Sequence, residues 1–419
     1  MIKTEYKLKN GLRVLLLDTQ AFPSVATLLL VSAGSRYENK KNNGIAHFFE
    51  HMAFKGSQKY PSALSISTLL DGIGSQQNAF TSKDHTGYWI KAPLKHFATV
   101  IDVLSEMLLH SLLKSEEVER EKGVIIEEIN MYEDLPQYKV WDVFEDIIFP
   151  HSPLGYPTTG TKEIVSSFNR QTFTNYMDCL YRPNNAVLVV AGGLNGQEST
   201  IKEQIEAKFG SWQPKPTQEF VPINQQQARP QTNLISKATE QAHFVIGYPA
   251  FSRSSRHKYG LNVLTAILGG GMSSRLFYEL RERRGLCYYI QSGMELYEET
   301  GYMYTRAGVN VSQVKIEQAI SLIIKEQQKI IQAKLKKDEL NKAKEMIKGR
   351  TILALEDSFD LASFFGKREL FDQSEKDLET VLNKIDQVSL EEVIELAKQI
   401  LKPDKLNLAL ISPHKKIKI

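Results

Sequence analysis

The chain of 419 residues is too long for one ordinary hydrophobic core, so we expect two or three domains. Hydrophobic residues make up 42% of the chain and charged residues 24%, which excludes a disordered polypeptide and is typical of a soluble globular protein. Lys and Arg number 52 against 49 Asp and Glu, so the overall charge gives no support to nucleic-acid binding.

The N-terminus and the cysteines indicate a cytoplasmic protein. Residues 1–9 lack the apolar core of a signal peptide, and the longest apolar stretch, 25–33, is far shorter than a membrane span. Cys179 and Cys287 lie far apart and do not have the spacing of metal ligands. We therefore expect no disulfide framework, no cysteine zinc site and no association with a membrane.

Short apolar runs predict strands near the beginning and the end of each half of the chain. In the first half these runs are 13–17, 26–31 and 185–190, and in the second half they are 243–246 and 406–411. Long charged helices, such as 115–133 and 314–350, alternate with the strands. This order favours an α+β fold with helices packed on sheets.

The segment 213–232 is the predicted linker, because it combines four prolines with a run of glutamines and has no hydrophobic period. It separates a first domain, 1–212, from a second, 233–419. Both halves begin and end with strand-like runs, which suggests duplication of one unit. We expect two homologous α/β sandwich domains, each a mainly antiparallel sheet covered by helices.

The strongest chemical signal is His47-Phe48-Phe49-Glu50-His51, within a helix expected over residues 45–54. His47 and His51 share one face, so both imidazoles can bind one ion, and Glu50 lies beside them. The helix is apolar on almost every side, and burying these groups without partners would cost at least several kcal/mol. A divalent metal removes that cost. The alternative is that both histidines are ordinary core residues and that Glu50 pairs with an arginine.

Four blocks of sequence resemble the pitrilysin family, which includes insulin-degrading enzyme and the mitochondrial processing peptidases. The blocks are 47–56 (HFFEHMAFKG), 77–86 (QNAFTSKDHT), 121–128 (EKGVIIEE) and 274–288 (SRLFYELRERRGLCY). The resemblance covers most of the chain. It implies one zinc ion per chain, with His47 and His51 as ligands and Glu50 as the general base. The third ligand in this family is a glutamate that corresponds here to Glu127 or Glu128.

The helix that carries these glutamates allows a choice between them. At about 100° per residue, three apolar side chains define its buried stripe: Val118, Ile125 and Ile129. Glu121 lies about 60° and Glu128 about 80° from the centre of the stripe, on the same side, and Glu127 lies about 180° away. We therefore predict that Glu128 is the third ligand and that Glu127 faces solvent. Glu121, seven residues before Glu128, matches a glutamate that supports the site in relatives.

The resemblance also implies two substrate-binding elements. The segment Asn78, Ala79, Phe80 and Thr81 matches an edge strand on which relatives bind an extended peptide by strand addition. Arg281 and Tyr288 match an Arg/Tyr pair that reaches the substrate and the tetrahedral intermediate from the second domain. The alternatives are a plain strand end at 78–80, a surface arginine and a tyrosine that merely begins a strand.

Together these features predict a zinc-dependent endopeptidase that hydrolyses extended or unfolded peptides through a metal-activated water. The alternative is a non-catalytic scaffold or partner subunit of a related peptidase heterodimer. Relatives of double length enclose their substrate between four such domains, whereas this chain has two. We therefore expect a homodimer, or a heterodimer with a related subunit.

Overall fold

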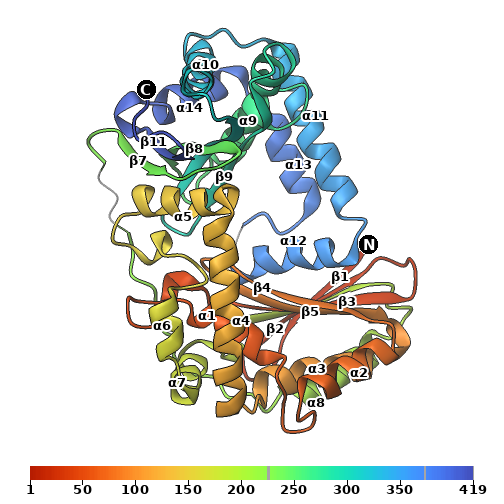
Figure 1. Cartoon of the computed structure of the whole chain (residues 1–419). Coiled ribbons are helices and arrows are strands. Elements are labelled where there is room, and N and C mark those ends of the chain that lie inside the picture. Colours follow the sequence, from red (N-terminus) through yellow and green to blue (C-terminus); the bar gives the residue numbers. More distant parts are fainter. Residues whose placement is uncertain (224–226, 372–373, 419) are drawn as a thin grey trace. The chain divides into compact units, whose positions relative to one another are not determined.

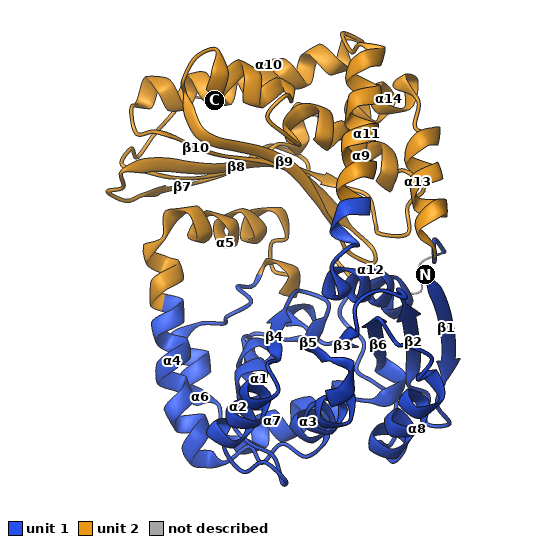
Figure 2. Cartoon of the chain, turned by 90° about the vertical axis from the view of Figure 1, so that its right-hand side faces the viewer, with its two compact units in different colours: residues 1–129, 156–221, 352–376 blue, residues 130–155, 222–351, 377–419 orange. Residues whose placement is uncertain are grey.

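The computed structural model describes residues 1–223, 227–371 and 374–418 (Figure 1). The chain forms two compact units, coloured separately in Figure 2. Unit 1 comprises Met1–Ile129, Tyr156–Val221 and Ile352–Lys376, and unit 2 comprises Asn130–Gly155, Pro222–Thr351 and Asp377–Ile419. Each unit contains one sheet, and each is described below by itself.

The sheet of unit 1 has the strand order β1-β2-β6-β3-β5-β4. Its strands are β1 (Ile2–Lys7), β2 (Arg13–Asp18), β3 (Ser24–Val31), β4 (Gln76–Thr81), β5 (Thr86–Pro93) and β6 (Ala186–Gly192). Only β2 and β6 pair in parallel, and all other neighbours are antiparallel. The strand β4 therefore lies at an edge of the sheet.

Both faces of this sheet are buried, which explains why its inner strands are almost continuously apolar. On one face Leu29 and Leu188 join a core with the helices α1 (Ile45–Ala53), α2 (Ala63–Gly72), α3 (Phe97–Leu109), α4 (Ser115–Asp134), α6 (Lys162–Ser167), α7 (Arg170–Leu180) and α8 (Glu198–Phe209). On the other face the alternate residues Leu28 and Val189 pack against Phe365 of α12 (Ser358–Leu370). Side chains that alternate along each strand therefore belong to two separate hydrophobic cores, one on each face of the sheet.

The sheet of unit 2 has the order β7-β11-β8-β10-β9. Its strands are β7 (Gln231–Ser236), β8 (Gln241–Ala250), β9 (Cys287–Leu296), β10 (Gly301–Asn310) and β11 (Asn407–Ser412). Its helices are α5 (Pro136–Ile148), α9 (Lys258–Gly269), α10 (Gln313–Ile331), α11 (Lys337–Ala354), α13 (Leu378–Gln387) and α14 (Leu390–Ile400). A core that includes Phe144 of α5, Val245 of β8 and Ala409 of β11 joins α5 to one face of the sheet.

The two sheets repeat one topology strand for strand. The series β2-β6-β3-β5-β4 corresponds to β7-β11-β8-β10-β9, and each series begins with its single parallel pair. The helix α12 packs on β3 and β6, and α5 packs on the corresponding strands β8 and β11. Each unit therefore takes one covering helix from the other half of the sequence (Figure 2).

The predicted α+β class, with two mainly antiparallel sheets covered by helices, is confirmed. The single helix predicted over 314–350 is wrong, because two helices, α10 and α11, occupy this range. After α10 the chain turns through Ala333, whose φ is 58°, and the amide of Lys334 donates to the carbonyl of Lys329. Such a helix end is usually marked by glycine, and alanine gave no signal.

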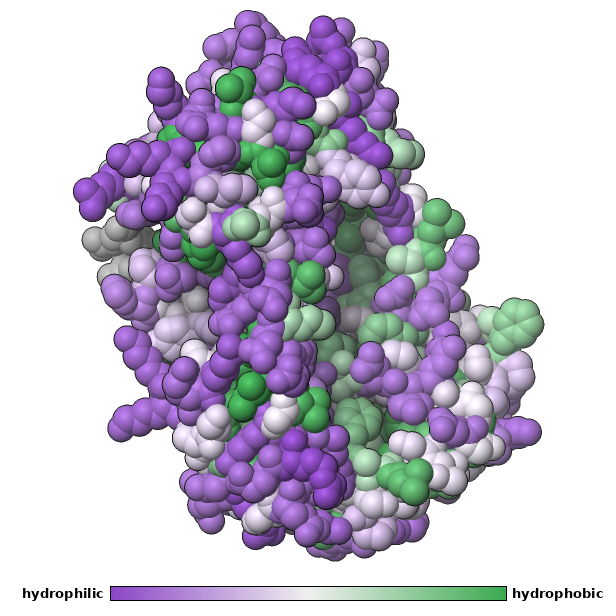
Figure 3. All heavy atoms as spheres, in the orientation of Figure 1, coloured by the Kyte–Doolittle hydropathy of each residue, from purple (hydrophilic) through white to green (hydrophobic). Residues whose placement is uncertain are grey.

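No helix among the described residues is long and apolar enough to cross a membrane. The face of the molecule in Figure 3 is mostly hydrophilic, and hydrophobic side chains form small groups on it.

Candidate metal centre

The helix α1, which carries the His-x-x-Glu-His motif, begins at a buried carboxylate. Gly44 precedes the helix with φ of 94°, a conformation that favours glycine. Both oxygens of Glu38 accept hydrogen bonds from the first turn, from the amides of Gly44 and Ala46, each at 2.8 Å. Burial raises the pKa of Glu38 to about 7 against the effect of these bonds. The carboxyl group thus fixes the start of the motif helix.

The apolar residues of α1 bury the helix and leave its polar groups on one side. Phe48, Phe49 and Met52 are at most 1% exposed. His47 is 9% exposed and His51 is partly buried. Their rings lie 4.8 Å apart, as expected for positions one helical turn apart.

The helix α4 places its glutamates as its periodicity suggests. Val118, Ile125 and Ile129 are buried. Glu121 is buried and Glu128 is partly buried, whereas Glu127 is exposed. The structure therefore brings Glu128, and not Glu127, to the two histidines.

One oxygen of Glu128, Oε2, lies 3.5 Å from Nε2 of His47 and 3.5 Å from Nε2 of His51. These distances are too long for good hydrogen bonds. They match the separation of about 3.4 Å between ligands in a tetrahedral site with bonds of roughly 2.1 Å. His47, His51 and Glu128 are the one group of this kind among the described residues, and their ligand atoms lie within 4.8 Å of one another. The donor set fits zinc.

Glu121 lies behind the ligand His51. Its Oε1 is 2.9 Å from Nδ1 of His51, and its Oε2 is 2.6 Å from Nζ of Lys55. Burial raises the pKa of Glu121, but the hydrogen bonds from His51 and Lys55 outweigh burial and lower it. A carboxylate in this place fixes the ring orientation and leaves Nε2 as the metal-binding nitrogen.

Thr81 is the last residue of β4 and of the predicted peptide-binding segment, and the structure gives it a contact that the sequence does not predict. Its hydroxyl donates a hydrogen bond of 2.6 Å to Oε2 of Glu50. The contact joins the end of β4 to the candidate general base. The sequence places Thr81 at the end of the peptide-binding segment but not against Glu50, because a threonine at a strand end has no periodicity that points to a carboxylate.

Asn78, Ala79 and Phe80 lie on the edge strand β4, which pairs only with β5 in the sheet. The amide of Ala79 donates to Oδ1 of Asn78 at 2.9 Å, so a side chain occupies a group that an added strand would use. The ring of Phe80 packs over Gly87 of β5, where an added Cβ would lie 2.4 Å from it. The edge is open to strand addition if the Asn78 side chain moves aside.

Arg281 and Tyr288 belong to unit 2, where the structure brings them together. Arg281 lies in a π-helical segment (Phe277–Glu282), and Tyr288 follows at the start of β9. The guanidinium carbon of Arg281 is 5.8 Å from the centre of the Tyr288 ring and 4.9 Å from that of Phe277. Tyr288 is 72% exposed. Both polar groups are thus available to a ligand.

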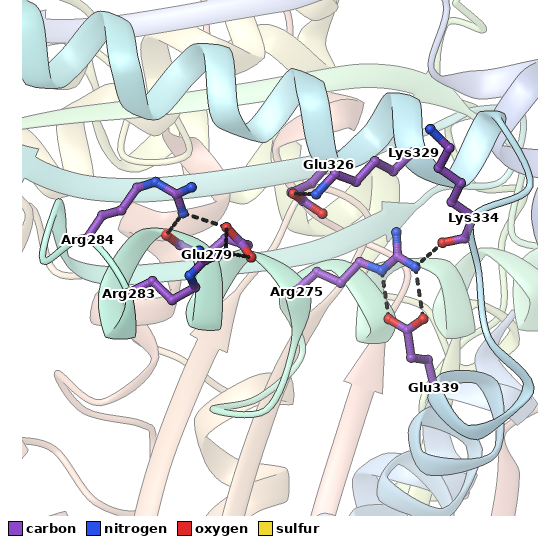
Figure 4. A network of polar contacts seen from close by, with 8 residues as sticks. All are labelled: Arg275, Glu279, Arg283, Arg284, Glu326, Lys329, Lys334 and Glu339. Atoms are coloured by element: carbon purple, nitrogen blue, oxygen red, sulfur yellow. Dashed lines mark hydrogen bonds and ion pairs between the residues drawn. The ribbon is translucent and has the colours of Figure 1, made fainter.

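A network of ion pairs holds the segment that carries Arg281 (Figure 4). Arg275, just before the π-helical turn, makes two bonds to Glu339 of α11, at 2.7 and 2.9 Å. Glu279, within the turn, accepts from Arg283 and Arg284. The pair of Glu279 with Arg283 has the local i,i+4 spacing, whereas the pair of Arg275 with Glu339 joins separate segments and could not be predicted from the sequence.

Comparison with known proteins agrees with the fold and the motif. A family model described as "Insulinase (Peptidase family M16)" matches residues 13–162, and one described as "Peptidase M16 inactive domain" matches residues 167–347. The chain is 38% identical to the uncharacterized zinc protease YmxG of Bacillus subtilis, over 99% of this chain and 98% of that protein. It is 33% identical to the uncharacterized zinc protease SCO5738 of Streptomyces coelicolor, over 97% and 89%.

Solved structures show the same fold at low sequence identity. A protease from Helicobacter pylori has a TM-score of 0.90 at 21% identity and covers 98% of this chain and 99% of its own. A peptidase M16 inactive domain from Pseudomonas fluorescens has a TM-score of 0.89 at 17% identity, with 100% of both chains covered. The sequence matches, which span both halves of the chain, show that this protein belongs to the insulinase family, peptidase family M16.

Proposed function

We propose that this chain is a zinc-dependent endopeptidase that cleaves extended or unfolded peptides. The observation that carries the proposal is the convergence of His47, His51 and Glu128 on one point. Glu50 lies beside the two histidines on α1. The names of the relatives, which are zinc proteases, support it.

Zinc at this site would polarise a peptide carbonyl and lower the pKa of a water molecule. Glu50 takes the proton from the attacking water and delivers it to the leaving amine, so that the peptide and one water give an acid and an amine. Thr81 holds one oxygen of Glu50 and thereby sets the direction of the carboxylate. Glu121 holds His51 in one tautomer.

We assign peptide binding to the edge strand β4. Once the Asn78 side chain releases the Ala79 amide, the backbone of residues 78–80 can pair with an extended peptide, and such pairing gives affinity without strong sequence preference. Arg281 and Tyr288 are assigned to the developing oxyanion, since a guanidinium and a phenol are suitable donors. A chain with two such units is expected to act as a pair of chains, homodimeric or heterodimeric.

The alternative function is a non-catalytic scaffold, and one experiment separates the two. Purified protein is analysed for metal and then incubated with a mixed peptide library, with and without a chelator. We expect about one zinc per chain and cleavage that the chelator abolishes and added zinc restores. Protein that binds no metal and leaves every peptide intact would contradict the peptidase and favour the scaffold.

A further inference from the structure

A pocket of about 680 Å³ opens in unit 2 beside Tyr288. The residues around the start of α5, the turn between β7 and β8, and the first residues of β8 and β9 form its wall. Figure 2 shows this turn next to the start of α5. The volume lies in the usual range for sites that bind small ligands.

His243 belongs to the wall of this pocket and is only 6% exposed. Across the sheet it is paired with Gly308, and Gly308 is paired with Tyr289. A Cβ at Gly308 would lie 2.5 Å from the Tyr289 ring, so glycine lets this ring cross the strand. The Tyr289 hydroxyl therefore reaches Nδ1 of His243, at 3.0 Å, and the two rings stack.

Two polar atoms of the pocket wall have no hydrogen-bond partner within the described part of the chain. They are Oγ1 of Thr239, which is buried and unpaired, and Nε2 of His243, which is not fully buried and belongs to a ring that hydrogen-bonds through Nδ1. Leaving the buried Thr239 hydroxyl unpaired costs about 1–3 kcal/mol. Both residues line one pocket, so a ligand hydroxyl there can reach Nε2 of His243, and it reaches Oγ1 of Thr239 once that side chain turns into the pocket.

The pocket favours an uncharged ligand. Burial lowers the pKa of His243, so its imidazole is neutral at neutral pH and Nε2 can either donate or accept. The cation in the wall, Lys237, already contacts the carbonyl of Glu133 at 2.8 Å and the carboxylate of Asp134 at 3.5 Å. Glu240 is exposed at the same wall. Tyr288 and Tyr289 offer aromatic faces for stacking.

We propose that this pocket binds an aromatic side chain of the peptide that carries a hydrogen-bonding hydroxyl, namely tyrosine. The phenol ring fits between aromatic walls, and its hydroxyl both donates and accepts, which suits Thr239 and His243. The proposal rests on the proposed peptidase function, because Tyr288 is the residue assigned there to the substrate. His243 is then the residue that determines specificity.

The test measures binding to the Glu50→Gln chain, so that cleavage does not interfere. A short fluorescein-labelled peptide carries one tyrosine, which is moved through each position and replaced by phenylalanine or arginine. We expect that at one position tyrosine binds roughly two- to tenfold more tightly than phenylalanine, the range of one net hydrogen bond. Equal affinities at every position, or a preference for arginine, would overturn the proposal.

Variants of the pocket make the test specific. His243→Phe keeps an aromatic ring but removes both nitrogens, and Thr239→Val removes the hydroxyl at nearly constant volume. Each should abolish or reduce the preference for tyrosine, and Thr239→Val serves if His243→Phe does not fold. The matched control is His257→Phe, in unit 2 but outside the pocket wall, which should keep the preference. A preference that survives in both pocket variants contradicts the assignment. If the unsubstituted chain binds the tyrosine peptide selectively but does not cleave it, the result contradicts the peptidase function and still supports the proposed pocket.

Discussion

Nδ1 of His51 lies 2.9 Å from Oε1 of Glu121, which connects the motif helix α1 to α4 behind the candidate metal ligands. The other oxygen of Glu121 is bound to Lys55, so the buried carboxylate has a fixed orientation. A histidine held in this way presents Nε2, and Nε2 is the atom that lies 3.5 Å from Glu128.

Glu121→Gln should weaken zinc binding without removing any ligand. The amide cannot replace the charge that holds the imidazole, and loss of such a supporting contact typically costs about 10–100-fold in metal affinity. Competition with a chelator of known affinity measures the change. Glu119→Gln, an exposed substitution on the same helix, is the control. Unchanged affinity in Glu121→Gln would mean that the residue serves only the fold.

Zinc binding should release a proton. Without metal, burial lowers the pKa of His51, but Glu121 and Glu128 outweigh burial and raise it to about 9. The two imidazoles hold the pKa of Glu128 well below its usual range, so this ligand is already ionised. Zinc therefore has to displace about one proton at neutral pH, and its apparent affinity should rise with pH up to about 9. Calorimetry in two buffers of different ionisation enthalpy measures the proton count, and a count of zero would contradict the expectation.

The same shift has a consequence for stability without metal. Folding raises the pKa of His51, so the protonated imidazole stabilises the folded state. This contribution to the free energy of unfolding is complete below the pKa of the unfolded chain, about 6.5, and is lost as the pH rises through about 9. Chelator-treated protein should therefore lose stability between these values, whereas zinc-loaded protein, in which zinc has displaced the His51 proton, should not show this loss. Denaturant unfolding at several pH values compares the two preparations.

Glu50→Gln should retain zinc and lose most turnover, since a general base is worth about 10²–10⁴-fold. Thr81→Val should lower kcat less and leave zinc content unchanged, because it removes only the hydrogen bond that directs Glu50. Peptide cleavage rates and metal analysis on the same preparations decide both. Full activity in Glu50→Gln would remove it from the role of base, and full activity in Thr81→Val would show that the contact is dispensable.

Arg281→Ala and Tyr288→Phe should each lower turnover by roughly 10–1000-fold and leave zinc content intact, because these residues act on the substrate. Tyr278→Phe, an exposed tyrosine of the same segment, is the control and should retain activity. Metal content and kcat are measured together. Loss of zinc in either of the first two variants would show that the assignment to the substrate is wrong.

The sequence predicted those features that local periodicity encodes. The five strands β2, β3, β6, β8 and β11, the motif helix and the side of α4 that carries Glu121 and Glu128 follow from apolar spacing, whereas the other strands of the two sheets were not predicted from it. The exchange of α5 and α12 between the units does not, because an apolar stripe does not specify which sheet it covers. The contacts of Thr81 with Glu50 and of Arg275 with Glu339 also join segments far apart in sequence, so only the folded chain shows them.

The decisive test of the metal centre compares two adjacent glutamates. Glu127 and Glu128 differ by about 100° around α4. This rotation leaves Glu127 exposed and brings Glu128 to both histidines. Glu128→Gln loses the charged ligand and should bind zinc far more weakly, with activity falling in parallel. Glu127→Gln makes the same chemical change one residue away and should keep zinc content and activity nearly unchanged. Metal analysis after dialysis against a weak chelator measures both, and circular dichroism checks that both variants are folded. Because the two substitutions remove the same charge from the same turn, a general electrostatic effect would weaken both equally. Zinc loss in Glu127→Gln alone would mean that α4 presents its other face to the metal.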